Sequence, residues 1–272
     1  MTAIEAFAPA KINLSLHITG RRDDGYHLLD SLVVFADIGD TLSVSLAPHR
    51  RLRVFGPMAA GVPDDGRNLI LRAAGMMGQG VDVMLDKRLP AAAGIGGGSS
   101  DAAACLRAIG ELTGKWPEDQ GLRLGADVPV CMAARAARMC GIGEQVTVLS
   151  EIPEAFAVLV NPGVAVPTPE VFRRLKVKQN PPMGDIPDWA DAGDLAVWLG
   201  QQRNDLQAPA VAAEPVIGTV LDAIGATGGC LLARMSGSGA TCFGLYGDQA
   251  AADAAAAGLQ RDGWWVAAAR LS

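Results

Sequence analysis

The chain has 272 residues, of which half are hydrophobic, and it carries a formal net charge of −6. This length and apolar content allow one large core or two smaller ones. With a sequence pI near 5.1, the chain has no basic footprint for nucleic acid, and we expect no nucleic-acid partner. It has no uninterrupted apolar run of about 18 residues and no signal-peptide pattern at its start, so we expect no membrane segment and a cytoplasmic protein.

The five cysteines form an odd set without a C-x-x-C pair. Such a set argues against a disulfide framework and against a zinc site. We therefore expect reduced thiols that mostly lie in the core, namely Cys105, Cys131, Cys140, Cys230 and Cys242.

Polar and apolar side chains alternate near the start of the chain, which predicts a strand over residues 11–16. Lys11, Asn13 and Ser15 would share one face, with the apolar residues between them on the other. A lone lysine on a strand is usually solvated. The pattern alone therefore favours an ordinary edge strand with no function at Lys11.

Asp24 and Gly25 form a strong turn signal, which would present Tyr26 and His27 at the start of the following strand or loop. A flat phenol beside an imidazole suits a nucleobase, since one ring can stack on the base and the other can bond its polar edge. A plain hairpin whose Tyr and His cover the core is the simpler interpretation. The pattern alone favours that hairpin.

Two later segments, residues 42–46 and 81–85, alternate in the way that half-buried strands do. Between them, Asn68 is placed to cap a helix that runs to about Met77. This arrangement makes antiparallel pairing of the two strands plausible.

The run 94–101 joins a glycine loop to the start of a helix, and Pro90 precedes it. Glycines let successive N–H groups approach an anion, and a helix N-terminus adds positive charge and free donors, so the run suits a phosphate. Ser99, Ser100 and Asp101 suit the N-cap of the helix. The run lacks the lysine of a P-loop and the spacing of a dinucleotide fingerprint. A flexible turn between a strand and a helix is the alternative.

Asp127 stands among small and apolar residues, in the segment 125–129. A carboxylate in such surroundings is costly to bury unless it pairs with a cation or with a hydroxyl of a ligand. Capping of a helix is an equally good interpretation of its position.

A break near residues 150–154 separates two halves, and we expect domains over residues 1–152 and 153–272. The second half predicts strands over 157–160, 241–246 and 264–269, helices over about 195–199 and 249–259, and a glycine turn over 237–239. Helices segregated from antiparallel strands make an α+β architecture. A proline-rich stretch over 180–187 carries no recognisable motif.

Taken in order, Lys11, the Gly-Tyr-His segment, the glycine run, Asp127 and the turn 237–239 resemble the GHMP small-molecule kinase superfamily, which includes galactokinase, homoserine kinase and mevalonate kinase. The likeness covers nearly the whole chain. The segments 9–14 and 20–27 are similar to the branch that acts on a diphosphocytidyl methylerythritol. The resemblance implies a two-domain α+β fold: an N-terminal ribosomal-protein-S5-like α/β domain, a C-terminal ferredoxin-like α+β domain, and the active site in the cleft between them.

This resemblance implies an ATP-dependent kinase that uses Mg²⁺ and phosphorylates a small-molecule substrate, a cytidyl diphosphate sugar alcohol, at the 2-hydroxyl of its methylerythritol unit. Lys11 and Asp127 match the catalytic pair of the family. Asp127 would accept the proton of the attacking hydroxyl, and Lys11 would support its charge and that of the reacting oxygens. The residues implied for ATP are Pro90, Gly94, Ile95, Gly96, Gly97, Gly98, Ser99 and Ser100. The metal ligands stay unknown, and we expect a monomer or a weak homodimer.

The same resemblance names the residues around the base. Tyr26 would stack on cytosine, His27 would bond its polar edge, and Phe172 would cover the opposite face. A helix contact between Phe172 and Leu175 is the alternative. The other residues implied for the substrate are Asn13, Thr168, Gly237, Ser238 and Gly239.

Two other activities stay open on the same fold. The first is a decarboxylase, against which the Tyr26–His27 segment argues, and the second is a non-catalytic nucleotide-binding module. The presence of both Lys11 and Asp127 counts against the second.

Overall fold

The computed structural model describes residues 2–91 and 93–272, and these form two compact units, each made of several chain segments. Unit 1 contains residues 2–11, 38–91 and 96–134, and unit 2 contains residues 12–37, 93–95 and 135–272. Neither unit is one continuous half of the chain. The domain boundary expected between residues 152 and 153 stays a prediction.

The strands of unit 1 form a sheet, and buried and less buried residues alternate along its strands as predicted for residues 42–46 and 81–85. Strand β5 (Val81–Asp86) pairs antiparallel with the second half of β3 (His27–Leu46), with Leu42 opposite Leu85. On its other side β5 pairs parallel with β4 (Arg51–Phe55), and β1 (Ala3–Asn13) pairs with β3. Every second residue of β5 is buried, so the antiparallel strands predicted over 42–46 and 81–85 are confirmed.

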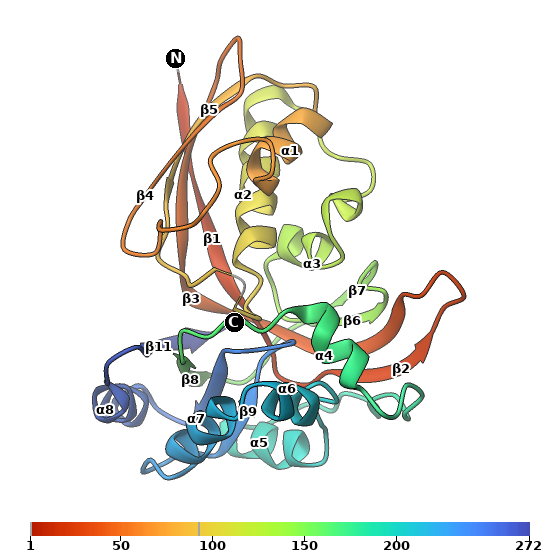
Figure 1. Ribbon diagram of the computed structural model, residues 1–272, viewed down its shortest axis with the longest axis vertical. Helices are drawn as coiled ribbons and strands as arrows, with labels where there is room; N and C mark the ends of the chain where they lie inside the picture. The colour runs from red at the N-terminus through yellow and green to blue at the C-terminus, as the bar shows by residue number, and fades with distance from the viewer. Residues whose placement is uncertain (1, 92) are drawn as a thin grey trace. The chain divides into compact units, whose positions relative to one another are not determined.

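The helices of unit 1 are α1 (Leu69–Met76), α2 (Gly97–Thr113) and α3 (Val128–Ala133), with a 3₁₀ turn at Leu122–Leu124. Helices α1 and α2 lie side by side (Figure 1) and pack on the sheet through Ile70, Ala104 and Ile109. The predicted cap of α1 is confirmed, because Asn68 Oδ1 accepts the Ile70 N–H at 2.9 Å.

The predicted cap of α2 is wrong. The helix begins at Gly97, and its N-cap is Gly96, which has a φ of +66° and makes no side-chain capping bond. The hydroxyl of Ser100 is committed elsewhere, since it donates to the Pro9 carbonyl at 2.8 Å. Asp101 pairs instead with Lys87. Glycine replaces a polar cap here because a left-handed N-cap favours a residue without a Cβ.

The central sheet of unit 2 is antiparallel. Its middle strand is β8 (Ala155–Asn161), flanked by β10 (Cys242–Tyr246) and β11 (Trp265–Leu271), and β9 (Leu232–Met235) pairs with the other edge of β10. All residues of β8 are buried, as expected for a strand covered on both faces. A second set of strands contains β2 (His17–Arg21), the first half of β3, β6 (Ala137–Gly141) and β7 (Gln145–Val148).

The helices of unit 2 are α4 (Thr168–Arg174), α5 (Ala192–Gly200), α6 (Gln207–Ala213), α7 (Val216–Gly225) and α8 (Gln249–Leu259). Helix α8 lies against β8 and β11 (Figure 1), and its bounds equal the predicted ones. The core of this unit includes Val158, Val160, Val220 and Leu259. In the part of the chain that the structure describes, no helix has both the length and the apolar character to cross a bilayer.

All five cysteines are free, as predicted, and none lies fully exposed. Cys105, Cys131 and Cys242 are buried, and Cys140 and Cys230 are half-buried. Burial raises the pKa of Cys105 and of Cys131 to about 12.

Candidate active site

Unit 1 brings Lys11 and Asp127 together across 116 residues of sequence. Lys11 Nζ lies 2.9 Å from Asp127 Oδ2, and the lysine is only 3% exposed. A buried ammonium needs a partner, so Lys11 is paired and is not the solvated lysine of an ordinary edge strand. The Asp127 side chain keeps 36% of its surface exposed and makes no capping bond to α3, although it precedes that helix directly. The pair therefore presents an accessible carboxylate beside a fixed cation.

The glycine turn of unit 1 leads directly into α2. A Cβ at Gly96 would lie 3.1 Å from the Lys11 Cβ, and a Cβ at Gly97 would lie 3.2 Å from the Lys87 Nζ. Gly96, whose φ is +66°, therefore needs glycine, and a side chain at Gly97 would crowd the Lys87 ammonium. The first N–H groups of a helix have no acceptor within it, so this turn offers backbone donors next to the Lys11–Asp127 pair. Such a turn can hold an anion.

Three residues expected at the phosphate lie in other surroundings. Pro90 is buried, and Ile95 is a core residue with no exposed surface. The Gly94 carbonyl accepts the Ser236 hydroxyl at 2.9 Å within unit 2. Any contact of these residues with a nucleotide stays a prediction, as it does for Gly98, Ser99 and Ser100.

In unit 2 the β2–β3 hairpin turns at Gly25, which has a φ of +93°, and the Arg22 N–H donates to the Tyr26 carbonyl at 2.7 Å. The predicted turn is therefore confirmed. It leaves Tyr26 at 59% exposed. The His27 ring stacks on Phe172 of α4, with 4.5 Å between ring centroids and 23° between ring planes.

His27 is the polar group of this aromatic pair. Its Nε2 is buried and has no hydrogen-bond partner among the described residues. Burial lowers the pKa of His27, and the nearby cations Arg21 and Lys178 lower it further. A neutral imidazole with an unused nitrogen can bond the polar edge of a ligand. The structure pairs Phe172 with His27, and a base held between Tyr26 and Phe172 stays a prediction.

A polar group of unit 2 surrounds the turn between β9 and β10. Asn13 is buried and donates from Nδ2 to the Ser31 hydroxyl at 2.7 Å, while its Oδ1 has no partner among the described residues. A Cβ at Gly237 would lie 3.3 Å from that oxygen. The hydroxyls of Ser238 and Thr168 lie 2.8 Å apart. Asn13 and Gly237 are therefore neighbours, and so are Ser238 and Thr168.

Two residues that shape this turn were missed by the sequence reasoning. Ser236 accepts the Asn13 N–H at 3.0 Å and donates to Gly94. Asn204 donates from Nδ2 to the carbonyls of Met235 and Gly237, at 2.7 and 2.9 Å. Asn204 has no local signal for this role, because its partners lie 31 and 33 positions away.

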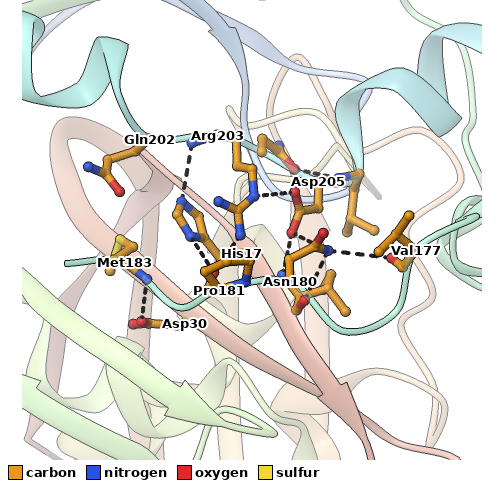
Figure 2. A network of polar contacts seen from close by, with 12 residues as sticks. His17, Asp30, Val177, Asn180, Pro181, Met183, Gln202, Arg203 and Asp205 are labelled. Carbon is orange, nitrogen blue, oxygen red and sulfur yellow. Dashed lines mark hydrogen bonds and ion pairs between the residues drawn. The ribbon is translucent and has the colours of Figure 1, made fainter.

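The proline-rich stretch packs along β2 and β3 (Figure 2). The Asn180 N–H donates to the Ile18 carbonyl at 3.0 Å, and the Met183 N–H donates to Asp30 Oδ2 at 2.9 Å. Asp30 is 3% exposed and also receives two bonds from Arg138, at 2.8 and 2.7 Å. Although burial alone raises the pKa of Asp30, the Arg138 contacts outweigh it and hold the pKa below its usual range.

His17 ties the same stretch to the segment before α6 (Figure 2). Its Nε2 accepts the Arg203 N–H at 3.2 Å, so Nδ1 carries the ring proton and donates to the Pro181 carbonyl at 3.3 Å. Burial lowers the pKa of His17, and the Arg203 cation adds to this. The bonds of His17 therefore require a neutral ring.

No group of three or more His, Cys, Asp or Glu side chains suited to a metal ion occurs in the described ranges 2–91 and 93–272. Mg²⁺ at a nucleotide site is held largely by phosphate oxygens and water, with one or two protein carboxylates. A metal that arrives with the nucleotide stays a prediction.

Comparisons with known proteins give one consistent family. Residues 68–154 match the family model described as GHMP kinases N terminal domain, and residues 183–263 match GHMP kinases C terminal. The chain is 58% identical over 269 residues to 4-diphosphocytidyl-2-C-methyl-D-erythritol kinase of Dinoroseobacter shibae, covering 97% of this chain and 93% of that protein. It is 54% identical over 275 residues to the protein of that name from Cereibacter sphaeroides, covering 98% and 99%.

Solved structures agree. A crystal structure of 4-(cytidine 5'-diphospho)-2C-methyl-D-erythritol kinase matches with a TM-score of 0.81 and 34% identity, covering 99% of each chain. Homoserine kinase from Cytophaga hutchinsonii matches with a TM-score of 0.67 and 19% identity, covering 99% of this chain and 95% of that one. The second likeness shows the shared fold alone.

Proposed function

Because the chain belongs to the GHMP kinases and, within them, to the family of the 4-diphosphocytidyl-2-C-methyl-D-erythritol kinases, we propose that it phosphorylates the 2-hydroxyl of 4-diphosphocytidyl-2-C-methyl-D-erythritol. The products are the 2-phosphate and ADP, in non-mevalonate isoprenoid biosynthesis. The observation that carries the chemistry is the buried Lys11 ammonium, 2.9 Å from the accessible Asp127 carboxylate.

Asp127 acts as the base in this proposal. The substrate 2-hydroxyl oxygen forms a bond to the γ-phosphorus of ATP, and its proton passes to an Asp127 oxygen. The bond from the γ-phosphorus to the bridging oxygen breaks, and ADP leaves with the electron pair. Lys11, held in place by its burial, offsets negative charge on the reacting oxygens. Phosphoryl transfer depends mainly on positioning and electrostatics, so a fixed charge pair suits it.

The start of α2 would receive the ATP phosphates on its backbone N–H groups, next to Lys11. Mg²⁺, when bound, would supply positive charge that offsets the charge developing on the phosphate. No residue of the chain is assigned to the metal.

The cytidine end of the substrate would meet His27, Phe172 and Tyr26. The unpartnered Nε2 of His27 suits the polar edge of cytosine, and the ring of Phe172 supplies an apolar face. The unpartnered Oδ1 of Asn13 suits a hydroxyl of the methylerythritol unit. An unused buried acceptor is costly, and a substrate hydroxyl would satisfy it.

The proposal is tested by coupled ADP release from the purified protein, with ATP and the cytidyl substrate. Turnover of that substrate, together with a clear preference for CDP over UDP in a binding titration, is the expected result. Turnover of homoserine or mevalonate instead would move the chain to another kinase of the superfamily. Release of carbon dioxide would make it a decarboxylase, and ATP binding without turnover would make it a binding module.

A further inference from the structure

Unit 1 contains a second buried lysine, which the proposed chemistry does not use. Lys87 follows β5 directly and is 3% exposed. Its Nζ pairs with Asp40 Oδ2 of β3, and it lies 2.9 Å from Asp101 Oδ2, which belongs to the fifth residue of α2. Both carboxylates are buried as well. Buried ion pairs give little net stability compared with apolar residues of the same size, so this cluster of Lys87, Asp40 and Asp101 calls for another explanation.

The cluster ties together the two ends of the segment that contains the glycine run. At the first end, Asp40 Oδ1 accepts the N–H groups of Arg88 and Leu89, at 2.6 and 2.9 Å. At the second end, Asp101 is bound by the same Lys87, 14 positions away. Glycines leave a chain with much conformational freedom, and clamping both ends reduces it.

Lys87 also lies close to the turn itself. A Cβ at Gly97 would lie 3.2 Å from the Lys87 Nζ and 3.9 Å from Asp40 Oδ2. Gly97 is the first residue of α2, where N–H groups without intrahelical acceptors face outward. The ammonium therefore lies beside the first residue of α2.

The charges of the cluster do not balance when both acids are ionised, since one ammonium faces two carboxylates. Asp101 Oδ1 has no hydrogen-bond partner among the residues described. Burial raises the pKa of Asp101 to about 7, with Asp40 also raising it and Lys87 opposing. On α3, the thiol of Cys131 is also affected by the charges of Asp101, Asp127, Lys11 and Arg107. Burial raises the pKa of Cys131 to about 12, so this thiol stays neutral. Asp101 is thus the member of the cluster that can change charge near neutral pH.

We propose that Lys87, held by Asp40 and Asp101, is a positioning residue for the nucleotide phosphates, and that Asp101 takes up a proton when they bind. The inference rests on the proposed binding of ATP at the start of α2. Phosphate oxygens bring negative charge to the turn, and this charge disfavours the ionised form of Asp101. By linkage, a protonated Asp101 binds the nucleotide more tightly than an ionised one.

Proton uptake is measured by titrating the protein with ADP in calorimetry buffers of different ionisation enthalpy at pH 7. We expect an uptake of up to about half a proton, because a group with a pKa near 7 is about half protonated at that pH. Asp101→Asn, which has nearly the same shape, is the reference, since the phosphate of ADP also exchanges protons. The parent protein should take up more protons than this variant on binding ADP, and the ADP affinity of the variant should depend less on pH between 6 and 8.

Kinetics test the positioning role. Lys87→Met should raise the KM for ATP by about 10-fold or more and leave the KM for the cytidyl substrate near its original value. Lys87→Arg should restore part of the loss, because it keeps the charge. The matched control is Arg53→Met, which removes an exposed cation paired with Asp82 on the same sheet, and it should change neither KM.

Three outcomes would overturn the inference. These are ADP binding with the same proton uptake in the parent protein and in Asp101→Asn, an unchanged pH dependence of affinity in that variant, and equal changes in both KM values for Lys87→Met. Failure to bind ADP at all would instead refute the proposed function. Since Asp101→Asn introduces no cavity and removes no cation, it tests the proposal even where Lys87→Met does not fold.

Discussion

Replacing the ring at position 172 tests the proposed base pocket. Phe172 is half-buried against the core of unit 2, and its ring stacks on His27 at 4.5 Å. In Phe172→Leu, an apolar side chain still covers the core, while the aromatic face is lost. The variant therefore separates the stacking role of the residue from its packing role, which Phe172→Ala would remove as well.

The size of the effect follows from the stack. A base stacked on an aromatic side chain gains about 1–3 kcal/mol, which corresponds to a rise of about 5- to 150-fold in the Kd for CDP. The His27–Phe172 contact is worth about 0.5–1.5 kcal/mol. This contact is lost from the free protein as well as from the complex. Its loss therefore lowers the free energy of unfolding more than it lowers the affinity for CDP. The Kd for ADP should change less than about twofold.

Calorimetric titration with CDP, UDP and ADP measures these affinities, and urea unfolding shows whether the variant is folded. Phe55→Leu is the matched control, because Phe55 is exposed at the end of β4 and belongs to unit 1. The reasoning is refuted if Phe172→Leu binds CDP as tightly as the parent protein, or if it loses CDP and ADP affinity equally.

Three further predictions concern single residues. Asp127→Asn should lower kcat by about 10²-fold or more while ADP still binds, and a near-normal rate in the coupled assay would contradict a base role. Because the pKa of His17 is lowered in the folded state, the unfolded chain takes up this proton first. Stability from His17 is therefore complete above a pH of about 6.5 and falls as the pH drops below it. His17→Gln should flatten that slope in urea unfolding, and an unchanged slope would exclude His17 as its source. Arg234 is buried and donates to the carbonyls of Leu14, Leu199 and Gln202. Arg234→Met should therefore lower the free energy of unfolding by about 2–4 kcal/mol. A loss under about 1 kcal/mol would argue against a stabilising role of these hydrogen bonds.

Local patterns predicted the parts of the fold that depend on local interactions. The bounds of α8 follow from Asp248, whose Oδ1 accepts the Ala251 N–H at 2.8 Å, and from the alanine-rich run after it. The start of α2 was predicted wrongly because Ser100 and Asp101 find partners 91 and 14 positions away. Capping rules describe only neighbours along the chain, so they miss such a competition.

The candidate site was predicted less by pattern than by resemblance. Periodicity alone favoured a solvated Lys11, whereas the structure buries it against Asp127, 116 positions away. The cluster around Lys87 gave no sequence signal at all, because lysine and aspartate are ordinarily exposed and Asp40 lies 47 positions from Lys87. Long-range pairing of charges is what a single sequence conceals.

The low reactivity of the native thiols makes it possible to follow the motions of this chain with a label on an introduced cysteine. All five are wholly or partly covered, and raised pKa values leave little thiolate, the form that reacts with maleimides. A cysteine introduced at Val197, 69% exposed on α5, would therefore take up a fluorophore against a nearly silent background. Spectroscopic labels can be placed one at a time without first stripping the native sulfhydryls from the interior.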